Sequence, residues 1–193
     1  MMNKTRCAWA GDDPVYHRYH DKEWGVPLHN DKKLFEFLIL EGMQAGLSWI
    51  TILKKRDAFR KAFDNFDCNK VAKYNKAKTD QLMQDAGIIR NRLKIDGAVK
   101  NAQAYLRVRE EFGTFNRYLW GYVDFTPIQN SRKSLQEVPA KTDLAEKLSK
   151  DLKKRGFTFV GPTIVYAMMQ ATGMVNDHTT DCFRHAEVKK LTP

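Results

Sequence analysis

Two cysteines and two histidines at opposite ends of the chain restrict its fold more than any other feature of the sequence. Cys7 and His20 lie near the N-terminus, and His178 and Cys182 lie near the C-terminus. Thiolates and neutral imidazoles are the ligands of structural zinc, whose site is closed when protein fills all four tetrahedral positions. The spacing of His178 and Cys182 would let one helical turn direct both side chains at a common point. The set fits a structural zinc that joins the two chain ends. It fits equally well two reduced cysteines and two histidines that lie near the termini by chance and bind no common metal ion.

The size and charge of the chain limit its fold and its partners. Its 193 residues are enough for one domain with a substantial core, and we expect a single all-α domain over residues 1–193. The formal charge of +10 favours a polyanionic partner, most commonly nucleic acid, although an acidic protein or a membrane surface would also fit. The sequence shows neither a signal peptide nor a membrane-spanning run. We therefore expect a cytoplasmic monomer with reduced thiols and no membrane partner.

Helical spacing of apolar residues dominates the sequence. We expect helices that begin behind a cap at Asp31, that follow Thr79 as far as Gly87, that extend along an apolar stripe from Ile95 to Gly113, and that span residues 115–123. Strand-like alternation is nearly absent, so the predicted fold class is all-α. The stretch 126–141, with its prolines and polar residues, is the one linker-like segment.

A helical hairpin is expected at about residues 143–173. Thr142 caps a helix that ends in Lys153, Lys154 and Arg155, a glycine-bounded turn follows over 156–161, and Pro162 suits the first position of the next helix. Free backbone amides at such a helix terminus can bind phosphate without reading a base. The same residues also fit an ordinary helical hairpin with a basic, exposed end.

Aromatic residues are concentrated in the first part of the chain. They are Trp9, Tyr16, Tyr19, Trp24 and Trp49. Glu41 follows Leu34 and Leu38 at helical spacing and should point to the same buried side, where a carboxylate is costly unless it is hydrogen-bonded. An acid beside aromatic rings suits a pocket for a flat cationic ring, which the faces of Trp and Tyr attract. The other interpretation is a helical core in which Glu41 accepts structural hydrogen bonds.

Five ordered segments carry more specific motifs. They are Arg6–Trp9, Tyr16–Pro27, Glu41–Trp49, Lys153–Gly161 and Val175–His178. Over nearly its full length the chain closely resembles the Tag family, the type I 3-methyladenine glycosylases of the helix-hairpin-helix DNA glycosylase superfamily. The resemblance implies a helix-hairpin-helix DNA glycosylase fold and a base-excision repair hydrolase that acts on alkylated double-stranded DNA. Such an enzyme would cleave the N-glycosidic bond of 3-methyladenine, release the free base and leave the strand uncut.

The resemblance also implies roles for individual side chains. Structural zinc would be held by Cys7, His20, His178 and Cys182. Trp49 would stack on a base that has rotated out of the duplex, while Tyr19 and the candidate catalytic acid Glu41 hydrogen-bond its edge. Trp9, Tyr16 and Trp24 would shape the pocket, and Leu47 would fill the space that the base leaves. The DNA backbone would be held at the hairpin by Lys153, Lys154, Arg155, Gly156, Gly161 and Thr163.

One position departs from the pattern of the wider superfamily. Many of its members carry an aspartate in a Val-Asp-x-His sequence beyond the hairpin. Here the sequence is Val175-Asn176-Asp177-His178, so an amide replaces that acid, and Asp177 is expected to face elsewhere. Because N3-methylation makes adenine cationic, the base departs neutral and needs no proton, which would let the enzyme work without the acid. The sequence leaves open whether Glu41 positions water as well as recognising the base.

Three other classes of protein share some of these features. A non-catalytic helix-hairpin-helix DNA-binding protein with structural zinc would share the hairpin and the metal, but it would not need Glu41 facing Trp49. A zinc hydrolase would need an open coordination position, which four protein ligands exclude. A purely structural helical protein would use the tryptophans as core and the charge for solubility, and it explains the combination poorly.

Overall fold

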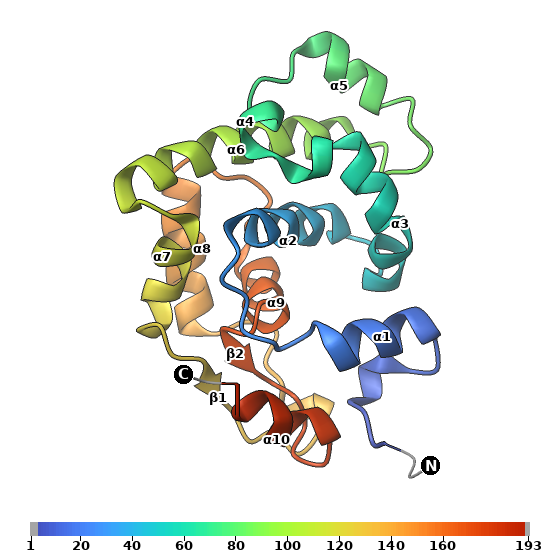
Figure 1. The fold of residues 1–193 in the computed structure, drawn as a ribbon, viewed down its shortest axis with the longest axis vertical. Helices are drawn as coiled ribbons and strands as arrows, with labels where there is room; N and C mark the ends of the chain where they lie inside the picture. The colour runs from blue at the N-terminus through green and yellow to red at the C-terminus, as the bar shows by residue number, and fades with distance from the viewer. Residues whose placement is uncertain (1–3, 192–193) are drawn as a thin grey trace.

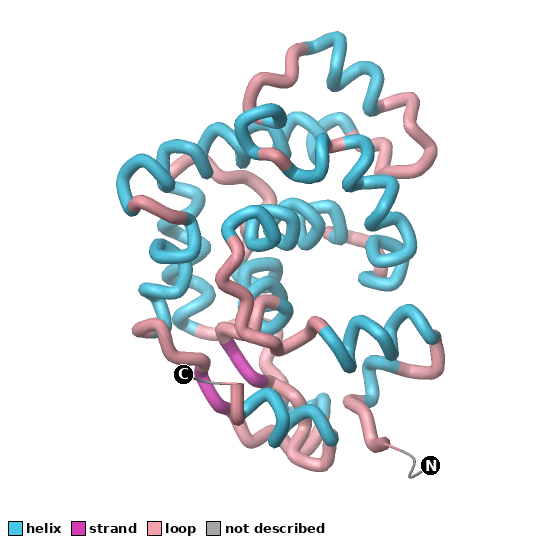
Figure 2. Tube along the Cα trace, in the orientation of Figure 1, coloured by secondary structure: helices cyan, strands magenta, loops and turns pink. Residues whose placement is uncertain are grey.

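The computed structural model describes residues 4–191 and is almost entirely helical (Figure 1). Its α-helices are α1 (Pro14–Lys22), α2 (Asp31–Gln44), α3 (Trp49–Ala62), α4 (Cys68–Val71), α5 (Lys76–Leu82), α6 (Arg92–Phe112), α7 (Phe115–Trp120), α8 (Asp143–Lys154), α9 (Pro162–Ala171) and α10 (Phe183–Lys189). Short 3-10 turns occupy Ala8–Ala10, Asp64–Phe66, Gly121–Val123 and Leu135–Glu137. Two strands, β1 (Ile128–Gln129) and β2 (Val175–Asn176), pair in parallel (Figure 2). The predicted all-α class is confirmed, since this short ladder is the only strand pairing within the described residues.

Helix α2 lies at the centre of the fold, in contact with α3, α6, α7 and α9 (Figure 1). Every residue from Leu34 to Met43 is buried, because neighbouring helices cover α2 on all sides. This burial carries two carboxylates into the interior. Glu36 is neutralised by Arg56 and Arg60. Among residues 4–191, Glu41 has no such partner.

The cap of α2 differs from the expectation. Asn30 caps the helix, because its side chain accepts a hydrogen bond from the backbone amide of Lys33. Asp31 is instead the first residue of α2. Its carboxylate accepts hydrogen bonds from the backbone amides of Phe115 and Asn116, so it links the start of α2 to the start of α7.

Three other helix bounds can be compared with the sequence. Helix α5 begins after the cap Asn75 and ends at Leu82, so the expected helix from Thr79 to Gly87 is wrong at both ends. Helix α6 ends at Gly113 as predicted. The helix expected over residues 115–123 is α7 followed by a 3-10 turn.

Helices α8 and α9 form the helical hairpin that the sequence predicted. Thr142 caps α8 through its hydroxyl, and Pro162 is the first residue of α9. Gly156 begins the turn with a φ of 94°, a left-handed conformation that favours glycine. Asn101 on α6 fixes the turn, because its amide donates to the Thr158 carbonyl at 3.0 Å and accepts from the Thr158 amide at 2.7 Å. The hairpin therefore has a set position against the core.

The two ends of the chain lie side by side. His178 and Cys182 are in the loop between β2 and α10, not in the helical turn that their spacing predicted, and Cys182 precedes α10 as its cap residue. The backbone amide of Phe183 donates to the carbonyl of Thr5 at 3.1 Å. Figure 1 shows α10 near the N-terminal segment.

The stretch 126–141, expected to be a linker, contributes β1 to the ladder with β2. Ile128 is paired with Val175, and Gln129 with Asn176. This pairing brings the stretch beside the loop that carries His178. Over residues 4–191, the structure contains no helix with the length and apolar character needed to cross a membrane.

Candidate active site and metal centre

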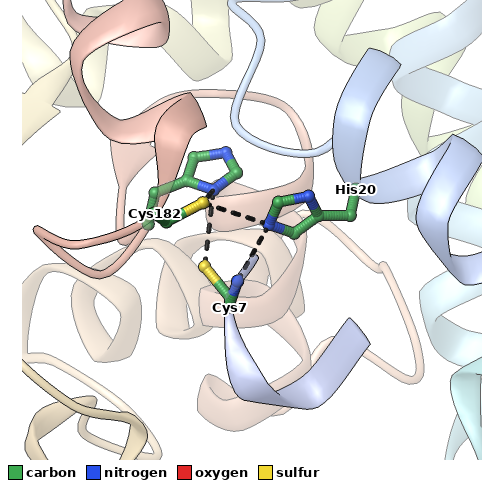
Figure 3. Close-up of side chains that lie close together, drawn as sticks. Cys7, His20 and Cys182 are labelled. Atoms are coloured by element: carbon green, nitrogen blue, oxygen red, sulfur yellow. Dashed lines mark hydrogen bonds between the residues drawn. The ribbon is translucent and has the colours of Figure 1, made fainter. Parts of the chain in front are cut away.

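Cys7, His20, His178 and Cys182 come together in one buried cluster, as the sequence predicted, and their four ligand atoms lie within 4.8 Å of one another. The Cys182 Sγ atom is 3.4 Å from His20 Nε2 and 3.6 Å from His178 Nδ1, and Cys7 Sγ is 3.5 Å from the same His178 atom. Figure 3 shows the side chains of Cys7, His20 and Cys182 converging. Zinc bonds of about 2.0–2.3 Å would separate tetrahedral ligands by about 3.5 Å. The cluster therefore has the dimensions of a tetrahedral metal site.

Neighbouring groups hold each imidazole with one nitrogen toward the cluster. His20 Nδ1 donates to Asp21 at 2.8 Å, and Arg6 holds that carboxylate with two hydrogen bonds of 2.9 and 2.7 Å. His178 Nε2 donates to the Trp24 carbonyl at 3.1 Å. Burial lowers the pKa of His178, which favours the neutral imidazole that binds metals. Such outer contacts are what orient histidine ligands in metal sites.

A cavity of about 280 Å³ lies beside this cluster. Its walls include all the side chains that were predicted to bind a base, namely Trp9, Tyr16, Tyr19, Trp24 and Trp49, together with Glu41. Cys7 also lines the cavity, and the ring of Trp9 lies 5.3 Å from that of His20. The Cys2His2 cluster thus supports one wall of the cavity.

The aromatic rings of the cavity meet largely edge to face. Trp9 lies at 80° to Tyr16 and at 69° to Trp24, with centroid separations of 5.6 and 4.9 Å. The Tyr16 hydroxyl accepts from the backbone amide of Ile50 at 3.0 Å, which fixes this ring against α3. The indole N–H groups of Trp9 and Trp49 are buried without a hydrogen-bond partner among the described residues. Since buried donors are rarely left unpaired, these two are unusual for a protein interior.

Glu41 lies in the last turn of α2 and is only 3% exposed. No hydrogen bond or ion pair to its carboxylate is found within residues 4–191, and burial raises its pKa to about 8. An acid with a purely structural role would have partners in the fold, so the interpretation of Glu41 as a structural acceptor is not supported. A cationic ring in the cavity would favour its ionised form. A buried acid of this kind is typical of a functional site.

The structure contradicts the orientation expected of Asp177. The Asn176 amide donates to Gln129 Oε1 at 2.8 Å and to the His185 carbonyl at 3.2 Å. Asp177, expected to face elsewhere, lines the cavity. Neighbouring residues of an extended segment point to opposite faces, which explains why the acid faces the cavity one position after the amide.

Several other cavity residues were not singled out from the sequence. They are Ala8, Gln44, Leu135, Val138, Ala167, Gln170 and Thr179. Gln44 lies inside the segment Glu41–Trp49, so that motif could have indicated it. Leu135 and Val138 belong to the stretch that was expected to be a linker. Gln170 follows an apolar run on α9 that predicts only a buried helix, and nothing in that pattern indicates a polar contact.

The loop between α2 and α3 presents Leu47 to solvent, with 41% of the residue exposed. Gly46 precedes it with a φ of 76°, in the left-handed region. Lys94 on α6 anchors the start of the loop, because its ammonium donates to the carbonyls of Met43 and Ala45 at 2.8 and 2.7 Å. Leu47 is therefore held at the surface by a firmly attached loop.

The hairpin residues predicted to bind DNA fall into two groups. Lys153, Lys154, Gly156 and Thr163 are exposed, and Gly161 is the cap residue of α9. Arg155 differs, because its guanidinium is paired with Glu111 and Asp151 and lies over the ring of Phe112. Its charge is thus compensated within the protein, whereas none of the ion pairs among residues 4–191 involves Lys153 or Lys154.

Comparison with known proteins gives a consistent match. The profile of the methyladenine glycosylase family matches residues 9–185. The chain is 50% identical over 178 residues to the DNA-3-methyladenine glycosylase of Haemophilus influenzae, covering 92% of this chain and 96% of that one. It is 50% identical over 177 residues to DNA-3-methyladenine glycosylase 1 of Escherichia coli, covering 92% and 95%.

Solved structures agree with these sequence matches. A crystal structure of a 3-methyladenine DNA glycosylase I superimposes with a TM-score of 0.91 at 47% identity, and covers 93% of this chain and 98% of that one. A structure of the 3-methyladenine DNA glycosylase I of Staphylococcus aureus, whose subject is 3-methyladenine recognition, superimposes with a TM-score of 0.90 at 41% identity. It covers 92% of this chain and 95% of that one.

A helical hairpin, an aromatic cavity with a buried acid and a Cys2His2 cluster define a protein of the helical DNA glycosylase class. The chain belongs to the methyladenine glycosylase family. The identification of this family from the sequence is confirmed.

Proposed function

We propose that this protein is a base-excision repair enzyme that releases 3-methyladenine from alkylated double-stranded DNA. The observation that carries the proposal is Glu41, a buried acid on the wall of an aromatic cavity of about 280 Å³, with no hydrogen-bond or ion-pair partner among the described residues. Flat aromatic walls and one acid suit a flat, cationic base. The relatives named DNA-3-methyladenine glycosylase, at 50% identity, support the same substrate.

Contacts with the DNA backbone would come first. The free amides at the start of α9, next to Gly161, can bind a phosphate, and Lys153 and Lys154 add positive charge. Such contacts hold any duplex without reading its sequence. The damaged nucleotide then rotates out of the stack into the cavity, and Leu47 fills the space that it leaves.

Recognition of the base would follow from the walls of the cavity. Trp49 stacks on the ring, while Tyr19 and Glu41 face its edge, with Trp9, Tyr16 and Trp24 completing the shape. A carboxylate accepts a hydrogen bond from the exocyclic amine of adenine and attracts a positively charged ring. At the same edge guanine carries a carbonyl oxygen, which a carboxylate repels.

Cleavage of the N-glycosidic bond transfers its electron pair to the base, which leaves as neutral 3-methyladenine. Water adds to the anomeric carbon of the sugar and gives up a proton to solvent. The positive charge therefore moves from the base to the sugar as the bond breaks. Because Glu41 attracts the cationic base before that transfer, we assign it chiefly to recognition of the damaged base.

Zinc is the metal that best suits two cysteines and two histidines in a tetrahedral cluster. Cys7, His20, His178 and Cys182 would hold it. With four protein ligands the ion would serve as a crosslink between the chain ends and would support the cavity wall at Cys7 and Trp9.

The decisive experiment is base release from methylated duplex DNA, with the products separated by chromatography. Free 3-methyladenine and an uncut strand are expected. Strand scission would indicate a different reaction, and duplex binding without any base release would favour the alternative, a non-catalytic DNA-binding protein.

A further inference from the structure

The carboxylate of Asp177 binds four neighbours at the edge of the cavity. Its Oδ2 atom accepts from the Tyr166 hydroxyl and, at 2.8 Å, from Gln170 Nε2. Its Oδ1 atom accepts from Asn130 Nδ2 at 2.7 Å and lies 3.8 Å from Arg132 Nε. The side chain is fully buried, with both oxygens already satisfied. Any effect of Asp177 on a bound molecule must therefore pass through one of these neighbours.

Gln170 is the one neighbour of Asp177 that itself lines the cavity. A carboxylate can only accept hydrogen bonds, so the atom that Gln170 turns toward Asp177 must be its amide nitrogen. This contact settles an orientation that the shape of an amide alone does not settle. The Gln170 oxygen is then turned away from Asp177, and among residues 4–191 no group donates a hydrogen bond to it.

We propose that the Oε1 atom of Gln170 is a fixed hydrogen-bond acceptor for a donor in the loaded cavity, and that Asp177 is the residue that positions it. This inference rests on the proposed function and adds two residues to which that function assigns no role. The donor is either the exocyclic amine of the flipped base or the water that attacks the sugar. A neutral amide accepts from both and adds no further charge beside Glu41.

Gln170→Met tests the acceptor, because methionine has a similar length but neither amide atom. Gln103→Met is the matched control, since Gln103 is exposed on α6 and makes one hydrogen bond, to the Ala72 carbonyl. Two quantities are measured on folded protein: the single-turnover rate of excision from methylated duplex DNA, and the Kd for free 3-methyladenine. Loss of one hydrogen bond should lower excision about tenfold in Gln170→Met and leave the control unchanged.

The two measurements identify the donor. If Gln170 accepts from the base, free 3-methyladenine binds more weakly and excision falls. If it accepts from the attacking water, excision falls while the affinity for the free base is unchanged. Unchanged excision and affinity overturn the inference, and so does an equal fall in Gln103→Met. A wild-type protein that releases no 3-methyladenine contradicts the proposed function itself, which is a separate result.

A double-mutant cycle tests the positioning role of Asp177. Asp177→Asn can present either a donor or an acceptor, so the Gln170 amide is no longer held in one orientation. If Asp177 acts through Gln170, this substitution lowers excision in the wild-type background but not in the Gln170→Met background. Additive losses overturn the positioning role. Zinc content is compared across the variants because Asp177 adjoins His178, and Gln170→Met removes one hydrogen bond to Asp177 but leaves the sequence of that loop intact.

Discussion

Glu41 and Trp49 face one cavity from two helices that the loop 45–48 joins. Glu41 lies in the last turn of α2, and Trp49 is the first residue of α3. Lys94 anchors the start of the loop from α6, and Leu47 projects from its exposed part. The position of Glu41 relative to the Trp49 ring, which we propose stacks on the base, therefore depends on the same loop that would enter the duplex.

Substitution of Lys94 tests whether the cavity and excision depend on the anchored loop 45–48. Lys94→Met leaves the carbonyls of Met43 and Ala45 without their donor, which we expect to cost about 1–3 kcal/mol of folding stability. Excision from duplex DNA should fall more than the affinity for free 3-methyladenine, because the loop matters most when DNA is bound. Thermal melts, excision rates and base binding are compared with Lys100→Met, the same change at an exposed position of α6. Unchanged excision per folded molecule would show that the anchor is not needed.

Removal of a metal ligand should affect stability and the cavity together. We expect Cys182→Ala to lower zinc content and to reduce the free energy of unfolding, on the order of several kcal/mol, because a zinc ion held by the cluster would join both ends of the chain. Binding of free 3-methyladenine should weaken, since Cys7 lines the cavity. Cys68→Ala is the control, because Cys68 is also buried but lies outside the cluster. Purified wild-type protein with well below one zinc per chain, unchanged by supplementation, would contradict the metal assignment.

The helical hairpin could be predicted from the sequence because it depends on local signals: Thr142 and Pro162 mark helix starts wherever the chain packs. The Cys2His2 cluster joins opposite ends of the chain, so residue types and spacing left it open, and only the family resemblance favoured it. A helical turn at His178 and Cys182, which their spacing allowed, does not form. Spacing of four residues fits a turn of helix, but the pairing of β2 with β1 holds the preceding residues extended.

The orientation of Asp177 could not be predicted, because it depends on register. In an extended segment a shift of one residue exchanges the two faces, and the sequence does not say which face meets the cavity. The aromatic residues and Glu41 could be named beforehand as a possible pocket for a flat cationic ring, but their individual roles came only from the family resemblance. Gln170 carried no signal, because the donor that orients it comes from a different part of the chain.

The hairpin contact with DNA can be tested at Gly161. A Cβ atom at this position would meet nothing within 4 Å, and aspartate is a favourable helix cap. Gly161→Asp should therefore fold at least as stably as the wild type, yet bind any duplex more weakly, because its carboxylate faces phosphate. Gly161→Asn has a similar shape without the charge and should retain most of the affinity. Equal binding by all three proteins, or a wild-type affinity that does not fall with salt, would place the hairpin outside the interface.

Glu41 should make the stability of the protein depend on pH. In the folded protein burial raises its pKa to about 8, whereas a glutamate in the unfolded chain has its ordinary value near 4.5. Between these values the folded state keeps a proton that the unfolded state has lost. Stability conferred by the protonated carboxyl therefore decreases as pH rises through this interval.

Glu41→Gln removes that titration and separates recognition from a structural role. We expect the variant to match the wild type in stability at about pH 5 and to be the more stable protein at about pH 8. Excision should nevertheless fall and free 3-methyladenine should bind more weakly, because the amide lacks the charge. Glu36→Gln in the same helix breaks ion pairs with Arg56 and Arg60 and should instead lower the melting temperature. Melts at both pH values and single-turnover excision decide between the roles, since a destabilised but fully active Glu41→Gln would make Glu41 a structural residue.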